Sequence, residues 1–225
     1  MNKLKTILIA ACSIVLVSFG TSYADSDNFA GPYIGLTASG TGVALSGTSN
    51  SAVDDTEGSS DEVQVGKVAA VAGGELGYAI PMGTGFLLDI GAAFYSGETM
   101  IRHDGGKDGD VNRRVAFKVD DLITAYIAPT VVLSDTSSLY IKIGISEADI
   151  GVEGDITTPA NLSGETWGIG TRTVLDSGLF IRTEAGYTEY NGISAHGTGT
   201  SIATGTSYSA EPTIAYGLVS MGFRF

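Results

Sequence analysis

The sequence predicts an all-β fold: an eight-stranded antiparallel transmembrane β-barrel that follows a cleaved N-terminal signal peptide. Three observations predict it. Eight segments alternate apolar and polar residues with a period of two, and the connections between them alternate strictly between short and long. Beyond the amino terminus, no run reaches the roughly 18 apolar residues that a membrane-spanning helix needs. A chain of 225 residues is long enough for one large β domain.

The first 24 residues have the three parts of a secretory signal peptide. Lys3 and Lys5 give a basic start, an apolar run covers 7–19, and the sequence Ser-Tyr-Ala at 22–24 supplies a small-x-small cleavage site. A transmembrane anchor is the alternative, but the run is short and a cleavage site follows it. The expected division is therefore a signal peptide at 1–24 and an outer-membrane β-barrel domain at 25–225.

Composition excludes several classes of protein. Cleavage would remove Cys12, the single cysteine, so an exported chain would fold without disulfides. Two of the 12 lysines and arginines also lie in the signal, which leaves ten bases against 25 acids. This acidity argues against a nucleic-acid partner, because phosphate would be repelled. A mean hydropathy of +0.21 and 32 glycines are unusual for a water-soluble domain.

Each of the eight predicted strands carries apolar residues on one face. The clearest is "FLLDIGAAFY", where Leu88, Ile90 and Phe94 share one face and Asp89 lies on the other. No stretch has convincing helical periodicity. The predicted strands cover residues 32–45, 63–80, 86–95, 115–133, 139–150, 166–175, 179–190 and 213–225.

The connections fall into two classes that alternate along the chain. "PMGTG", "SDTS" and "DSG" read as tight hairpin turns. The others, 46–62, 96–114, 151–165 and 191–211, are long and polar. All turns therefore fall at one end and all long loops at the other, as in outer-membrane barrels. A soluble β-sandwich or a lipocalin-like barrel is the alternative.

The first strand, "FAGPYIGLTASG", the terminal "GFRF" and the eight-strand layout resemble the OmpA/opacity-type family of small outer-membrane β-barrels. The resemblance implies a place in the bacterial outer membrane, in contact with lipid and lipopolysaccharide. It also implies that the apolar face of the last strand is read by the barrel-assembly machinery. The residues of this assembly signal are Val219, Met221, Phe223 and Phe225.

The alternation also predicts which charged residues point into the barrel. Isolated charges in a narrow, poorly hydrated interior would cost several kcal/mol each, whereas paired charges are tolerated. We therefore predict a salt-bridge network that plugs the lumen, with Arg224 extending it. If the charges do not pair, packing of Tyr126, Tyr140 and Phe180 must fill the interior. The predicted lumen residues are Glu75, Asp89, Lys142, Arg172, Arg182 and Glu184.

The sequence gives little support for catalysis or for a metal or other cofactor. His103 and His196 both lie in predicted loops, away from rigid strands that could hold a triad. "DGGKDGD" at 104–110 lacks the ligands of a calcium loop. The acidic residues at 54–62 are typical of a solvent-exposed loop. The predicted function is structural: envelope integrity, display of surface loops, and adhesion to an unidentified host or surface ligand. A small porin-like channel and a lipid-modifying enzyme are the alternatives, although eight strands leave little room for a pore.

Overall fold

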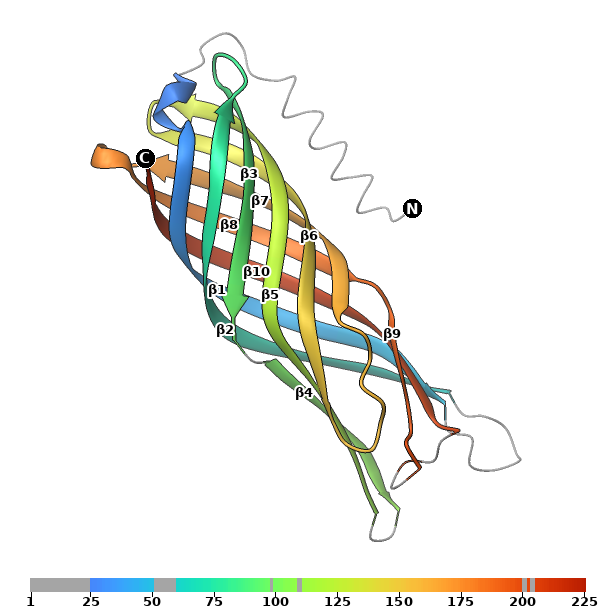
Figure 1. Cartoon of the computed structure of the whole chain (residues 1–225). Coiled ribbons are helices and arrows are strands. Elements are labelled where there is room, and N and C mark those ends of the chain that lie inside the picture. Colours follow the sequence, from blue (N-terminus) through green and yellow to red (C-terminus); the bar gives the residue numbers. More distant parts are fainter. Residues whose placement is uncertain (1–24, 51–59, 98, 109–110, 200–201, 203–204) are drawn as a thin grey trace.

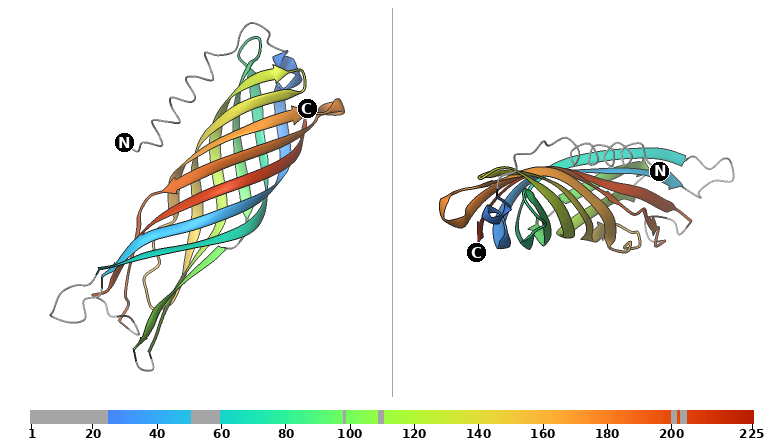
Figure 2. Two further views of the ribbon diagram at one scale, coloured as in Figure 1. Left: turned by 180° about the vertical axis from the view of Figure 1, so that it is seen from behind. Right: turned by 90° about the horizontal axis from the view of Figure 1, so that it is seen from above.

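A computed structural model describes residues 25–225 apart from 51–59, 98, 109–110, 200–201 and 203–204. It is a closed barrel of tilted strands (Figures 1 and 2). The predicted signal peptide lies outside the described residues. Among the residues that are described, no helix is long and apolar enough to cross a membrane.

Eight long strands form the wall, and each is antiparallel to its neighbours. β1 and β10 pair along 18 residues and close the barrel, so the predicted eight-stranded antiparallel barrel is confirmed. Two short strands, β4 and β9, pair with β5 and β10. The bounds are β1 Gly31–Asn50, β2 Ser60–Pro81, β3 Phe86–Ser96, β4 Thr99–Asp108, β5 Val111–Ser134, β6 Ser137–Glu153, β7 Leu162–Val174, β8 Leu179–Tyr190, β9 Ile193–His196 and β10 Ser207–Arg224.

Tight turns join β2 to β3, β5 to β6 and β7 to β8 at one end of the barrel, which we call the turn end. Two single-turn 3-10 helices lie there, η1 (Ser26–Asn28) and η2 (Asp176–Gly178). The first turn contains Gly83 and Gly85 with φ of 124° and 77°, a conformation that favours glycine. The longer connections gather at the opposite end of the barrel, which we call the loop end (Figure 1).

The wall continues beyond the strand ends that the sequence predicts. β4 and β9 lie inside segments predicted as loops, and they place His103 and His196 on strands, which corrects that prediction. In β9, buried Ile193 and Ala195 alternate with exposed Ser194 and His196, but four residues inside a polar stretch are too few to predict a strand. Backbone pairing with β5 and β10 holds both short strands, and this pairing does not depend on side-chain pattern.

A β-bulge in β5 sets which residues of that strand face inward. The register with β6 shifts between Asp120 and Leu122, and Asp121 between them has a φ of 40°. On the turn side of the bulge, even-numbered residues such as Thr124 and Tyr126 are buried inside, while on the loop side Val119 is buried. An extra residue in one strand changes the face parity in this way.

Candidate functional site: the barrel lumen

The interior is layered along the barrel axis, beginning with an apolar cluster at the turn end. Phe29, from the segment before β1, is fully buried in it, and its ring lies among residues of five strands. Tyr33 and Phe180 meet edge to face, with their ring centroids 5.8 Å apart. The cluster comprises Phe29, Tyr33, Ala79, Leu87, Val132 and Phe180.

The six charged residues predicted for the lumen lie inside the barrel and form three ion pairs, each between different strands. Lys142 Nζ lies 2.7 Å from Glu184 Oε1, and Arg182 Nη1 lies 2.8 Å from Glu75 Oε2. Arg172 pairs with Asp89. All six residues are buried. A buried charge needs both a partner and further hydrogen bonds, so this layer depends on its surroundings.

Hydroxyl groups supply part of those further hydrogen bonds, while Glu75 Oε1 and Arg182 Nη2 have no hydrogen-bond partner among the described residues. The Tyr140 and Tyr216 hydroxyls donate to the two oxygens of Glu184, each at 2.8 Å. The Thr130 hydroxyl donates to Asp89 Oδ2 at 2.7 Å. Glu184 therefore accepts from three donors, Lys142 included, and is the most extensively hydrogen-bonded carboxylate of the three.

Aromatic rings stack on the three cations. The Arg182 guanidinium lies 4.4 Å from the centroid of the Tyr140 ring, and Lys142 Nζ lies 4.4 Å from that of Tyr126. Arg172 lies 4.7 Å from the Tyr33 ring. Such contacts are worth about 2 kcal/mol or more when desolvated. Charge pairing and aromatic packing, which the sequence offered as alternatives, therefore occur together.

Glycines face the lumen's aromatic residues directly across the strands. Five rings lie over a glycine that is their register partner, and a Cβ on that glycine would overlap the ring. Sequence analysis missed this arrangement, although the inward parity of glycines and aromatics on neighbouring strands could have indicated it. The pairs are Tyr33 with Gly77, Tyr126 with Gly91, Tyr140 with Gly170, Tyr216 with Gly186, and Phe180 with Gly222.

A row of hydroxyls follows the charged layer toward the loop end. Thr124, Ser146, Thr166 and Thr188, from β5 to β8, are linked in sequence by hydrogen bonds. Beside this row lies a cavity of about 20 Å³, lined in part by Thr188, Lys142 and Tyr216. That volume is enough for one water molecule, and these polar groups could bind it.

A second apolar cluster fills the interior at the loop end. It contains Val43, Leu45, Val119, Ala148, Ile150, Leu162, Tyr190, Ile193 and Ile214. Beyond it, the β6–β7 and β8–β10 connections are joined by a β-bridge between Ile156 and Gly197. Ile156, Ala195 and Ile202 pack together there. The charged layer therefore lies between two apolar clusters.

The outward face is apolar, including the end of β10. Val219, Met221, Phe223 and Phe225 all point away from the lumen, and the rings of Phe223 and Phe225 meet at 5.2 Å. Arg224 does not join the lumen ion pairs. Its Nη1 donates to the carbonyl oxygens of Asp27 and Ala30 instead, which corrects the expectation that it extends the network.

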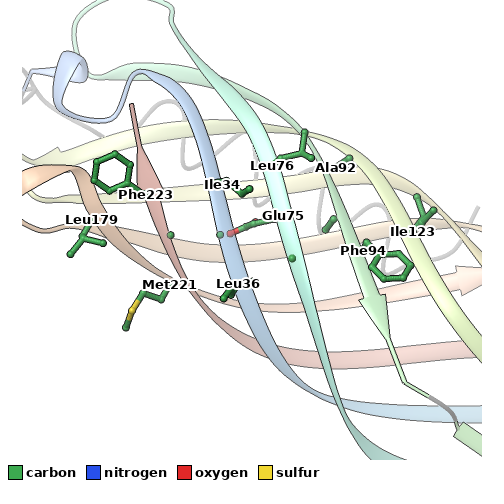
Figure 3. Close-up of a pocket in the computed structure, with 14 residues that line it drawn as sticks. Ile34, Leu36, Glu75, Leu76, Ala92, Phe94, Ile123, Leu179, Met221 and Phe223 are labelled. Carbon is green, nitrogen blue, oxygen red and sulfur yellow. The ribbon is translucent and has the colours of Figure 1, made fainter.

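An apolar groove of about 620 Å³ lies across the outer wall (Figure 3). Gly74 and Ala92 are the small outward residues that line it. The larger side chains around it include Leu36, Leu76 and Phe94. The groove belongs to the outer wall, whereas Glu75, also drawn in Figure 3, pairs with Arg182 inside the barrel.

Comparison with known proteins assigns this architecture. The family described as "Outer membrane protein beta-barrel domain" matches residues 11–209. The chain belongs to this family. Its location is therefore the bacterial outer membrane, and the apolar outer wall is the surface that faces lipid. No curated protein sequence matches the chain.

Comparison with solved structures finds similar chains at low sequence identity. The outer membrane protein OprG from Pseudomonas aeruginosa is 12% identical with a TM-score of 0.52, covering 87% of this chain and 97% of that one. Ail, the attachment invasion locus protein of Yersinia pestis, is 12% identical with a TM-score of 0.41, covering 85% and 99%. Neisserial surface protein A is 10% identical with a TM-score of 0.40, covering 84% and 97%.

Proposed function

We propose that the protein is a non-conducting, non-enzymatic barrel that reinforces the outer membrane and displays its loop end on the cell surface. The observation that carries the proposal is the filling of the lumen. Three buried ion pairs cross it, and an apolar cluster lies on either side of them. An aqueous pore needs a hydrated interior, as in larger barrels, whereas eight strands leave an interior that side chains fill.

The turn end is proposed to face the periplasm and the loop end the outside, as short and long connections do in outer-membrane barrels. In this orientation the joined β6–β7 and β8–β10 connections are presented to the environment. Adhesion to a host or other surface ligand would use these loops. Proposed partners at the wall are membrane lipid and lipopolysaccharide, and β10 would be the strand read by the barrel-assembly machinery.

A deletion strain tests the structural role. We expect loss of the protein to increase sensitivity to detergents and large antibiotics, and the full chain to restore resistance. Complementation by a chain with residues 151–161 and 191–206 shortened would separate the two parts of the proposal. Restored resistance without restored surface adhesion supports both parts. Slower uptake of small solutes by the deletion strain, with an intact envelope, would instead favour the channel.

A further inference from the structure

The seam between β1 and β10 differs from the other ladders of the described barrel. Every other neighbouring pair of wall strands is joined by a turn or a loop, whereas β1 and β10 are the first and last strands of the wall. Strand ends that nothing ties down open most readily. At the turn end of the seam, a non-covalent contact must therefore replace the missing connection.

Arg224 provides such a contact across the seam. It is the last residue of β10, and its Nη1 donates to the carbonyl oxygens of Asp27 at 3.1 Å and Ala30 at 2.9 Å. Next to it, the backbone N–H of Phe225 donates to the Pro32 carbonyl at 3.0 Å. Gly31 lies between the two contacts with a φ of 111°, and a Cβ there would come within 2.9 Å of the Phe225 carbonyl oxygen.

The same segment, residues 25–30, is fastened to the rest of the turn end. The Ser26 hydroxyl donates to the Gly83 carbonyl in the β2–β3 turn at 3.2 Å. The Asn28 amide donates to the Asp135 carbonyl in the β5–β6 turn at 3.3 Å. The Phe29 side chain fills the mouth of the lumen. Figure 1 shows this segment at the same end as the turns and the carboxyl terminus.

We propose that residues 25–30 form a latch that holds the turn end of the seam closed. In this latch the Phe29 side chain packs inside the lumen, and Arg224 at the end of β10 donates hydrogen bonds to the segment. The latch takes the place of the turn or loop that joins every other pair of neighbouring wall strands at one end. This role goes beyond the filling of the lumen, because it predicts a local effect on one ladder of the eight.

Hydrogen exchange measured by mass spectrometry on the full chain, folded in lipid nanodiscs, tests the latch. In Phe29→Ala and Arg224→Met we expect amides around the Ile34–Phe223 register pair to exchange at least tenfold faster than in the wild type. Amides around the Ile141–Ile169 pair of β6 and β7 should not change. Leu175→Ala, an exposed side chain at the same end, is the matched control and should leave the seam unchanged.

Seam exchange at the wild-type rate, or equal acceleration in both ladders, would overturn the latch. If the variants fail to fold, a disulfide across the seam decides the question. Leu36 and Met221 are register partners, and no cysteine follows Cys12 in the sequence. Leu36→Cys with Met221→Cys should restore folding of Phe29→Ala under oxidising conditions. Absence of rescue would also contradict the proposal.

Discussion

The two faces of the same strands follow different rules. On β2, Glu75 is 5% exposed and pairs with Arg182, whereas its neighbour Leu76 is 61% exposed on the outer wall. Inside, each charged residue and most aromatic residues have specific partners. Outside, the side chains share a preference for hydrocarbon and little else. The difference shows that specific contacts between lumen side chains determine the structure of the interior, whereas the outer wall requires only apolar side chains.

Glycines on the lumen face and on the outer face differ in the same way. Gly186 and Gly170 face the lumen, where an added Cβ would overlap the rings of Tyr216 and Tyr140. Gly40 and Gly217 face outward, and an added Cβ at either would meet no atom within 4 Å. Glycine is therefore a steric requirement inside the barrel but not at these two outer positions.

The largest effect should come from breaking one lumen ion pair. In Glu184→Ala, Lys142 loses its counter-ion, and the Tyr140 and Tyr216 hydroxyls lose their acceptor. We expect the free energy of unfolding to fall by about 3–5 kcal/mol, measured by urea titration in lipid vesicles. Lys142→Met combined with Glu184→Gln removes both charges and keeps an acceptor, so it should recover most of this loss. An unchanged Glu184→Ala midpoint would show that the pair contributes little.

A charge on the outer wall should cost somewhat less. Leu36 is 77% exposed on the face that meets lipid, and Leu36→Arg should lower the free energy of unfolding by up to about 2–4 kcal/mol in vesicles. Leu36→Met is the matched control, because the wall requires only an apolar side chain. If Leu36→Met were as damaging as Leu36→Arg, the proposed difference between the two faces would be wrong.

Adding one methyl group should separate the two kinds of glycine. Gly186→Ala forces the Tyr216 ring to move and should cost about 1–3 kcal/mol. Gly40→Ala should change the free energy of unfolding by less than about 1 kcal/mol, and by reducing the freedom of the unfolded chain it could stabilise the protein. Equal effects of the two substitutions in the same urea assay would remove the distinction.

The smallest effect on stability is expected at the carboxyl terminus. Phe225 lies at the membrane edge, where the charge of Phe225→Asp should lower the free energy of unfolding by about 0–1 kcal/mol. We nevertheless expect its level in the outer membrane to fall strongly, because the assembly machinery would no longer recognise β10. Immunoblots of membrane fractions measure this, with the refolded variant's stability as the control. Normal membrane levels would exclude Phe225 from the assembly signal.

Much of the barrel could be predicted from the sequence because strand alternation is a local pattern. A side chain two residues from Leu88 or Leu139 must point the same way, so the inward set, Arg182 and Glu184 included, follows from parity. The partner of each charge could not be predicted in this way. Pairing Lys142 on β6 with Glu184 on β8 depends on strand tilt and register across the lumen.

Other features depend on contacts that have no local pattern. Phe29 docks among lumen residues from several strands, and Arg224 contacts the carbonyl of Asp27, 197 residues earlier in the sequence. β4 and β9 are held by backbone pairing with β5 and β10. The alternation of β9 covers only four residues, which is too short to distinguish a strand from a loop. The bulge at Asp121 shifts the parity of β5, and the predicted strand at 115–133 did not include that shift.

Conductance across a planar lipid bilayer tests the central claim, that the lumen is closed, most directly. Purified protein, refolded and inserted at 1 M salt, should give no conductance steps above the bare bilayer. Lys142→Ala combined with Glu184→Ala removes one ion pair and provides the comparison in which the charged layer is incomplete. Stable, repeated single-channel steps from the wild-type protein would contradict a closed lumen and identify the barrel as a channel.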